Sequence, residues 1–316
     1  MTHRRLALID MGTNTFHLLI VELPKAAEAL PVPTVLLRTK VGVKLGEGGI
    51  SHGEIAPEAF ARALHTLAAF QEEIELHQVT DVRATATSAV RVARNGAELV
   101  QAIFEQTGIR VEIIPGEREA ELIAKGIRQA VPLGLAPHLL MDIGGGSVEF
   151  ILANDAQIFW KQSFEIGAQR LLDKFFTEDP LPAAAVQAEQ AYLSEVLAPL
   201  TDAVLQHRPA GLVGASGTFD TLCDLQAARA GRPELVGHAA PATVISPESF
   251  QHSYQQLLAL DHAGRLALPG MTPLRADMIV VACVLIDFVL RRYNLTQITA
   301  SAYALKEGFL AEILGQ

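Results

Sequence analysis

The chain has few cysteines, no long uncharged hydrophobic run and fewer basic than acidic residues. Its two cysteines, Cys223 and Cys283, lie among apolar neighbours without a Cys-x-x-Cys spacing. This excludes a disulfide framework and predicts buried thiols in a reducing compartment. The longest apolar run, 278–290, contains Asp287, which argues against a membrane span. Only four apolar residues precede Asp10, too few for a signal peptide, so we expect a cytoplasmic protein without a membrane partner.

Charge and composition narrow the class of partner. The 316 residues include 25 Lys and Arg against 35 Asp and Glu, which gives a net charge of −10. Nonspecific binding to nucleic acid needs a basic surface, so no nucleic-acid partner is expected. A phosphate ligand would need a local site built from backbone N–H groups, a few arginines and a metal ion. With 50% hydrophobic residues, the chain is long enough for two folded domains.

Hydrophobic periodicity predicts alternating strands and helices. The predicted strands cover residues 6–9, 16–23, 34–43, 81–90, 110–114, 157–163 and 211–214, a hairpin over 138–153, and a strand near 298. The predicted helices cover residues 57–77, 95–105, 117–130, 168–176, 182–206 and 275–293, and the stretch from about 304. Asn95 and Glu98 have the spacing of a capping box, and Ser246 before Pro247 is typical of a helix start.

The first strand pair is repeated in the second half of the chain. The segment LIDMGTNTFHLLIV, residues 8–21, aligns without gaps on LMDIGGGSVEFILA, residues 140–153. Asp10 therefore corresponds to Asp142, and His17 on the second strand corresponds to Glu149. Such self-similarity predicts two related domains, each beginning with a strand, a tight polar turn and a second strand.

The two turns are candidate phosphate sites. A tight turn of glycine and hydroxyl residues directs several N–H groups into one concavity, which binds phosphate without net positive charge. Asp10 and Asp142, at the ends of the first strands, can hold Mg²⁺ directly or through water. One such turn alone would favour an ordinary hairpin, whereas two matched copies favour phosphate binding. The candidate phosphate-binding residues are Thr13, Asn14, Thr15, Gly144, Gly145, Gly146 and Ser147.

Glu119 is a candidate catalytic residue. It lies near the start of a predicted helix, on the side that carries Ile123 and Gly126 rather than on the charged side. Burying a carboxylate on an apolar stripe costs free energy, so the carboxylate should have a hydrogen-bond partner or a function there. It can accept a capping hydrogen bond there, or act as a general base that directs water at phosphorus.

Three other polar side chains each allow a functional and a structural interpretation. Arg91 follows a strand and a Thr/Ser-rich turn, where it can bind phosphate or remain a surface arginine. Glu149 can orient water or a metal, or face solvent from its strand. Ser216 precedes a probable helix, where it can cap the helix or help to bind an anion. Three further basic residues can contact an anion, or can equally well form a structural ion pair. They are Arg170, Arg275 and Lys306.

The paired Asp-x-Gly turns resemble the two phosphate motifs of the actin, sugar kinase and heat-shock ATPase superfamily. Within it the sequence is most similar to the exopolyphosphatase and guanosine pentaphosphate phosphohydrolase (Ppx/GppA) family. The resemblance covers nearly the whole chain, in family order, through the segments DMGTNT, ATSAVRVARN, IPGEREAELIAKGI, DIGGGSVEF, SFEIGAQRL, GASGTFDTL and YALKEGFL.

The resemblance implies an α/β fold of two ribonuclease-H-like (actin-like ATPase) domains. Each would have a mixed five-stranded sheet flanked by helices, with a cleft between the domains. The N-terminal domain would comprise residues 1–125 plus 303–316, and the second domain residues 126–302. The family's proposed catalytic glutamate precedes alanine in the matching segment, which corresponds to Glu119. The resemblance also favours roles for Arg91 in phosphate binding and for Glu149 in the cleft.

The implied activity is Mg²⁺-dependent hydrolysis of the terminal phosphate of inorganic polyphosphate. Three alternatives stay open: a guanosine pentaphosphate phosphohydrolase, a kinase of the superfamily, and a non-enzymatic sensor of nucleotide or polyphosphate. A homodimer is compatible with all of them. The sequence departs from the family at Phe16-His17 and at Lys306, and it ends soon after YALKEGFL, without the helical domains of long members. Processive hydrolysis of long chains is therefore in doubt.

Overall fold

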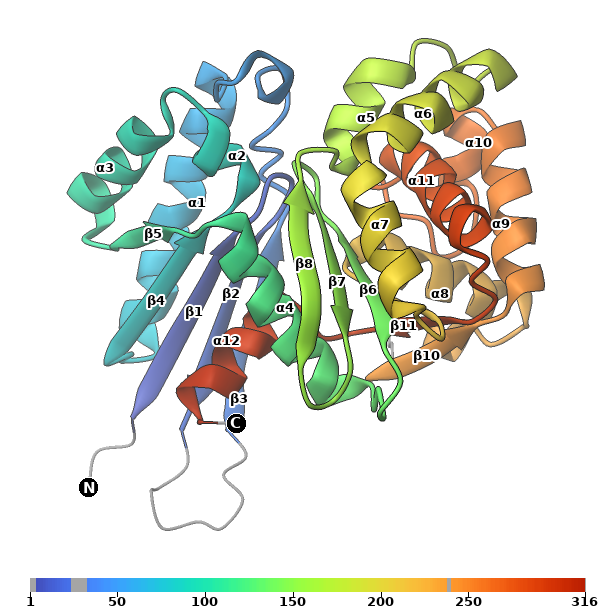
Figure 1. The fold of residues 1–316 in the computed structure, drawn as a ribbon. Coiled ribbons are helices and arrows are strands. Elements are labelled where there is room, and N and C mark those ends of the chain that lie inside the picture. The colour runs from blue at the N-terminus through green and yellow to red at the C-terminus, as the bar shows by residue number, and fades with distance from the viewer. Residues whose placement is uncertain (1–3, 24–32, 238–239, 316) are drawn as a thin grey trace. The chain divides into compact units, whose positions relative to one another are not determined.

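The computed structural model describes residues 4–23, 33–237 and 240–315 (Figure 1). The chain forms two compact units, Met1–Glu119 with Phe309–Gln316, and Ala120–Gly308. It passes from the first unit to the second within helix α4 (Gly116–Ala130) and returns within helix α12 (Leu305–Ile313). Each unit has its own sheet and its own hydrophobic core.

The first unit is built on a five-stranded mixed sheet of order β3-β2-β1-β4-β5. Strands β1 to β3 form an antiparallel meander, and β4 and β5 continue the sheet parallel to β1. The strands are β1 (Arg5–Met11), β2 (Phe16–Glu22), β3 (Thr34–Val41), β4 (Asp81–Ala86) and β5 (Val111–Ile113). The helical segments are η1 (Ile50–His52), α1 (Pro57–Leu76), α2 (Ser88–Val92) and α3 (Gly96–Thr107).

Alternation along β1 and β2 gives this sheet two buried faces. Ala7 and Ile9 of β1 belong to a core that α1 and α3 close, with Leu67 and Leu99 among its members. The intervening side chains face the other way, and Phe309 of α12 packs against that second cluster. The second cluster contains Leu6, Leu8, Leu19 and Val21.

The second unit has a six-stranded sheet of order β10-β11-β9-β6-β7-β8. Strands β6 to β8 again form an antiparallel meander, and β9 and β11 are parallel to β6. The strands are β6 (His138–Ile143), β7 (Val148–Ala153), β8 (Ile158–Phe164), β9 (Leu212–Ala215), β10 (Ala242–Ile245) and β11 (Ile298–Ser301). The helical segments are α5 (Ala168–Phe175), α6 (Ala183–Val196), α7 (Ala198–His207), α8 (Gly217–Arg229), η2 (Pro233–Leu235), α9 (Pro247–Ala259), α10 (His262–Leu266) and α11 (Met278–Tyr293).

The order of strands in both sheets confirms the expected α/β class of ribonuclease-H-like domains. The expected five strands are correct for the first sheet and wrong for the second. The sixth strand is β10, which pairs antiparallel with β11 at the edge of the sheet. Its four residues are too few to produce a clear alternation in the sequence.

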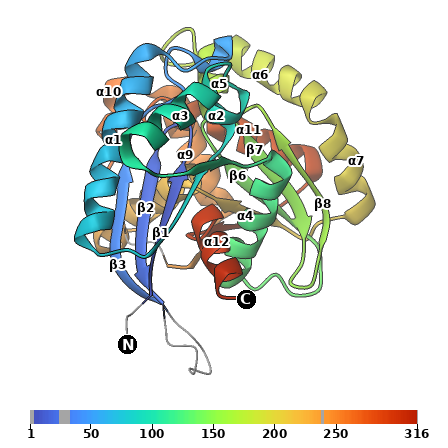
Figure 2. The same cartoon turned by 90° about the vertical axis from the view of Figure 1, so that its left-hand side faces the viewer.

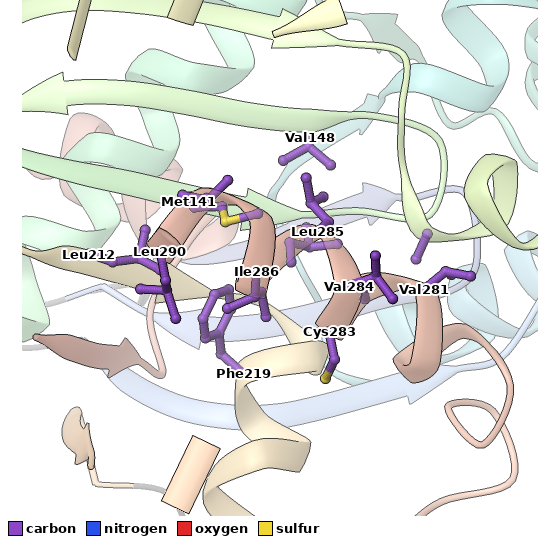
Figure 3. Packing of buried hydrophobic residues seen from close by; sticks show 14 of the residues in the cluster. Met141, Val148, Leu212, Phe219, Val281, Cys283, Val284, Leu285, Ile286 and Leu290 are labelled. Carbon is purple, nitrogen blue, oxygen red and sulfur yellow. The ribbon is translucent and has the colours of Figure 1, made fainter. Parts of the chain in front are cut away.

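Helix α11 is the centre of the second unit's core (Figure 3). Its residues from Met278 to Ile286 are all buried, which explains why the sequence of this helix has no polar stripe. Ile286 lies near Phe219 of α8, and Leu285 lies near Val148 of β7. The face of the sheet that carries Met141 and Val148 is therefore fully committed to packing.

Most predicted elements are confirmed, and the differences have local causes. The predicted strand 81–90 ends at Ala86, because the chain turns there into the short helix α2. The predicted helix 182–206 is two helices, and Pro199 lies in the first turn of the second. The helix predicted over 275–293 begins three residues later, at Met278.

The two predicted helix caps differ in outcome. Ser246 accepts a hydrogen bond from the Ser249 N–H, which confirms the cap of α9. The capping box at Asn95 is wrong, because its side-chain oxygen accepts from the Ile55 N–H instead. No helix in the described part of the chain has both the length and the apolar character needed to cross a bilayer.

Candidate functional site

The two Asp-x-Gly turns have the same backbone geometry, each within its own unit. The Gly12 N–H donates to the Thr15 carbonyl at 3.1 Å, and the Gly144 N–H donates to the Ser147 carbonyl at 3.0 Å. At either glycine a Cβ atom would lie 3.0 Å from that carbonyl oxygen, so both positions are tight for a side chain. The repeat in the sequence is therefore also a repeat in three dimensions.

The second turn is oriented by the start of α5. The carbonyls of residues 144–146 accept hydrogen bonds of 2.9 to 3.1 Å from the N–H groups of residues 167–169. In a trans peptide the N–H points opposite to the preceding carbonyl, so the N–H groups of residues 145–147 are directed away from α5. Three successive N–H groups on one side form an anion-binding concavity.

Two further contacts hold this turn in place. Arg170 Nε donates to the Gly146 carbonyl at 2.9 Å. Gly167 packs so closely on Gly145 that a Cβ atom there would collide with its backbone. Arg170, one of the possible anion contacts, therefore supports the turn from the side of its carbonyls.

The first turn follows the same plan with different partners. The carbonyls of Thr13 and Asn14 accept from the N–H groups of Gly46 at 3.0 Å and Lys44 at 2.9 Å. The N–H groups of Asn14 and Thr15 consequently point the other way. The side chains of Thr13 and Asn14 are buried, and the Thr15 hydroxyl lies 3.3 Å from His17 Nε2.

Asp142 and Glu149 are neighbours on adjacent strands of the second sheet. They lie opposite each other in the β6–β7 register, on the face away from the α11 core. Both are buried, with exposed fractions of 5% and 1%. Like charges opposite each other destabilise a sheet, so a structural role alone would not favour this pair. Ser163 partly compensates by donating a hydrogen bond of 2.6 Å to Glu149.

Burial raises the pKa of the Asp142 carboxyl to about 6. A hydrogen bond with the Ser216 hydroxyl opposes this change, and the nearby charge of Asp220 adds to it. Lys306 and Arg275 lower the pKa by their positive charge. A cation beside Asp142 would favour its ionised form in the same way.

The first sheet has Asp10 at the position that corresponds to Asp142. Asp10 lies opposite His17 in the β1–β2 register, as Asp142 lies opposite Glu149. The histidine and the glutamate therefore occupy equivalent positions, as the alignment predicts. Only the second unit has two carboxylates at this pair of positions, which makes Asp142 the better candidate for a cation.

Glu119 and Arg91, both in the first unit, form a short ion pair. Arg91 Nη1 donates to Glu119 Oε2 at 2.8 Å and to the Ile114 carbonyl at 3.2 Å. Glu119 is 6% exposed, and its neighbours on the same helix, Leu122 and Ile123, are buried. The structure thus confirms that Glu119 lies on the apolar side of α4. A buried carboxylate oriented by a guanidinium has a fixed direction, which suits a group that must orient water.

A further group of polar residues surrounds Asp142 at the start of α8. Arg275 is 8% exposed, its guanidinium covers Gly217, and it makes no hydrogen bond with a described side chain or carbonyl. Burial lowers the pKa of Arg275, against the charges of Asp220 and Asp142. This grouping depends on contacts between segments far apart in the sequence, so the sequence could name Ser216 and Arg275 only as separate possible anion contacts.

The donor atoms fit Mg²⁺ better than a metal held by protein alone. No group of three or more His, Cys, Asp or Glu side chains in the described ranges is arranged to hold a metal ion. Mg²⁺ normally uses one or two carboxylates and completes its shell with water and substrate phosphates. Asp142, buried beside an anion-binding turn, is suited to that mode.

Two α/β units that each present an Asp-x-Gly turn, together with a buried Glu–Arg pair, define a class of phosphate-handling proteins. The model of the Ppx/GppA phosphatase family matches residues 24–316. The chain therefore belongs to that family.

Solved structures agree with this assignment. The chain is 45% identical to an exopolyphosphatase from Cytophaga hutchinsonii ATCC 33406, with a TM-score of 0.93 over 99% of this chain and 98% of that one. It is 25% identical to an exopolyphosphatase-like protein, with a TM-score of 0.83 over 98% of both chains. The Ppx/GppA enzyme of Aquifex aeolicus, 22% identical with a TM-score of 0.78 over 98% of this chain and all of that one, shares the fold.

Proposed function

We propose that the protein is an exopolyphosphatase that removes the terminal phosphate of inorganic polyphosphate. The buried Glu119–Arg91 pair is the observation that carries the proposal. A hydrolase needs a fixed group that accepts a proton from water, whereas a kinase needs a site for an acceptor substrate. The similarity to an exopolyphosphatase at 45% identity supports the same reaction.

In the proposed reaction the N–H groups of residues 145–147 bind oxygens of the terminal phosphoryl group. Side chains of Thr13, Asn14 and Thr15 and the Arg91 guanidinium offset further negative charge. The oxygen of a water molecule bonds to phosphorus, and Glu119 accepts a proton from that water. The bond from phosphorus to the bridging oxygen breaks, and orthophosphate leaves with the shortened chain as the other product. No covalent phosphoenzyme is required.

Asp142 is the proposed residue that would hold Mg²⁺, with Glu149 as the second acidic group opposite it in the β6–β7 register. Asp10, at the corresponding position of the first unit, is the other proposed metal residue. Bound Mg²⁺ would supply charge that stabilises the phosphoryl oxygens in the transition state. The remaining chemistry belongs to this chain, because the turn orients the phosphate and Glu119 holds the proton.

The test is release of orthophosphate from polyphosphate, with Mg²⁺ and with excess chelator. Wild type is expected to release phosphate only with the metal. Glu119→Gln keeps the shape of the side chain but cannot take up the proton, and we expect kcat to fall by about 10²–10⁴-fold. Glu117→Gln, at an exposed position two residues earlier on α4, is the matched control and should keep wild-type kcat. A Glu119→Gln variant with wild-type kcat would disprove the assignment of the base.

Guanosine pentaphosphate is the second candidate substrate. Arg275, whose guanidinium lies over Gly217 at the start of α8, favours it. A buried guanidinium without a hydrogen-bond partner in the described chain suits a second phosphate group. Comparing kcat/KM for the two substrates separates the candidates. Formation of ADP that requires an acceptor would instead support a kinase, and tight binding without turnover would support a sensor.

A further inference from the structure

Arg265 of α10 is the largest fully buried side chain among the described residues. A buried guanidinium has five N–H donors, and each donor left without a partner costs free energy. All five are used here. Nε donates to the Ala276 carbonyl at 2.5 Å. Nη1 donates to the Leu260 carbonyl at 2.6 Å and to Asp179 Oδ1 at 2.7 Å, and Nη2 donates to Asp179 Oδ2 at 3.2 Å and to Asp277 Oδ1 at 2.9 Å.

These hydrogen bonds anchor the segment that carries Arg275. Ala276 and Asp277 directly follow Arg275, and they accept from Arg265 through a backbone carbonyl and through a side chain. Asp179, in the connection between α5 and α6, binds the same guanidinium with both of its carboxylate oxygens. Two parallel hydrogen bonds of this kind fix the orientation of the guanidinium. The two residues after Arg275 are therefore attached to a separate segment of the second unit.

The place of the Arg275 side chain depends on this anchoring. Its guanidinium lies so close to the start of α8 that a Cβ atom on Gly217 would be 2.1 Å from Nη2. Arg275 is buried, but its guanidinium makes no hydrogen bond with a side chain or carbonyl that the structure describes. The head group is therefore not held by a hydrogen bond of its own, and the backbone of residues 275–277 determines where it lies.

We propose that Arg265 is a positioning residue, which holds residues 276–277 so that the Arg275 guanidinium stays over the start of α8 and binds a phosphate group beyond the terminal one. Replacing a buried ion pair by apolar side chains of similar size often costs no stability, which favours a role in fixing geometry over one in stability alone. A guanidinium that is ordered before the substrate arrives loses less entropy on binding. This inference rests on the proposed function, which gives Arg275 its contact with a second phosphate group.

The test is binding of methylene-bridged tripolyphosphate, which cannot be hydrolysed, measured by calorimetry with Mg²⁺. Arg275→Ala should weaken binding about ten- to hundredfold, because a hydrogen bond between charged groups is lost. Arg265→Lys keeps the charge but has a single nitrogen, which cannot reach all the partners of a guanidinium, and should weaken binding about fivefold or more. Arg232→Lys, at an exposed position of the same unit, is the matched control and should bind as wild type does.

A double variant separates positioning from general support of the fold. Once Arg275 is replaced by alanine, Arg265→Lys has no guanidinium left to position, so the double variant should bind within about twofold of Arg275→Ala. Losses of affinity that multiply, or an Arg265→Lys variant that melts earlier but binds as wild type does, would overturn the positioning role. Should Arg265→Lys fail to fold, Asp179→Asn loosens the same guanidinium from its partly exposed partner and should give the same pattern at about two- to tenfold.

Release of orthophosphate from polyphosphate, measured in parallel, separates this inference from the proposed function. Arg265→Lys should raise KM and leave kcat within about twofold, because the affected contact is with a phosphate that does not react. If wild type binds the analogue but releases no phosphate, the proposed function fails, and the binding of the single and double variants decides the role of Arg265. If Arg275→Ala binds the analogue as wild type does, the positioning role is overturned whatever the activity. A wild type that neither binds the analogue nor releases phosphate overturns both.

Discussion

Glu189 of α6 shows how a single residue can set the pH dependence of stability. Its side chain is completely buried, and neither carboxyl oxygen has a hydrogen-bond partner among the described residues. Burial raises its pKa to about 9. Its charge would act on Tyr254 of α9 and on Cys283 of α11, the two titratable groups linked with it. At neutral pH Glu189 is therefore a protonated acid in the core.

This predicts a loss of stability with rising pH. The folded state keeps the Glu189 proton up to about pH 9, whereas the unfolded state loses it near its ordinary value. The native state thus binds more protons between these values, and the free energy of unfolding falls as pH rises through that window. Glu189→Leu removes the unpaired carboxyl, and we expect it to stabilise the protein by about 1–3 kcal/mol at pH 7.

Urea denaturation at pH 5, 7 and 8.5 measures the effect. The stability difference between Glu189→Leu and wild type should widen as pH rises. Glu195→Gln, at an exposed position on the same helix, should change stability by less than about 0.5 kcal/mol. A difference that is constant with pH would contradict the assignment of a buried neutral acid.

Residues whose role is local could be predicted from the sequence, and those whose role depends on distant contacts could not. The turn residues and Glu119 were visible because strand, turn and helix patterns determine where their side chains point. The contact of Gly167 with Gly145 and the pairing of Asp142 with Ala215 join segments that are far apart in the chain. No short sequence window contains both members of either pair.

At the scale of elements, α4 and α12 lie side by side at a contact between two glycines (Figure 2). Within the second unit, a Cβ atom on Gly126 would overlap the Ala304 carbonyl oxygen, and one on Gly308 would overlap the Leu122 carbonyl oxygen. Backbone atoms cannot move aside as a side chain can, so the two helices can approach this closely only because both residues are glycine.

Gly126→Ala should therefore destabilise the protein by about 1–3 kcal/mol through overpacking. Helix propensity alone predicts the opposite sign, a gain of about 0.5–1 kcal/mol. The free energy of unfolding in urea decides between them. Gly264→Ala in α10 is the matched control, because its nearest neighbour is the end of the Leu260 side chain, which can move. A stabilised Gly126→Ala variant would show that the two helices are free to separate.

The elements that the sequence missed or misplaced share a physical cause. Strand β10 is short and has an exposed residue, Val244, so pairing with β11 rather than periodicity makes it a strand. Asn95 matches a capping box, but a competing contact with the backbone of Ile55 uses its amide. In both cases tertiary pairing overrides a weak local signal.

At the scale of the whole molecule, a net charge of −10 must accommodate a polyanionic substrate. Long-range repulsion slows the encounter, whereas the backbone N–H groups of residues 145–147 act only at short range. Salt screens charges farther apart than about 10 Å at 0.1 M ionic strength. For polyphosphate we therefore expect kcat/KM to rise as ionic strength increases from about 0.01 to 0.1 M at constant free Mg²⁺, the reverse of a protein that attracts its substrate with a basic surface.

The rise in kcat/KM with ionic strength should come only from faster association of substrate with the protein. Saturating polyphosphate is already bound, so kcat should stay constant while KM falls. The effect should be larger for long chains than for tripolyphosphate, because each added phosphate increases the charge that is repelled. A kcat/KM that falls with salt would mean that local arginines dominate the approach of substrate, and the acidic balance of the chain would then have no bearing on catalysis.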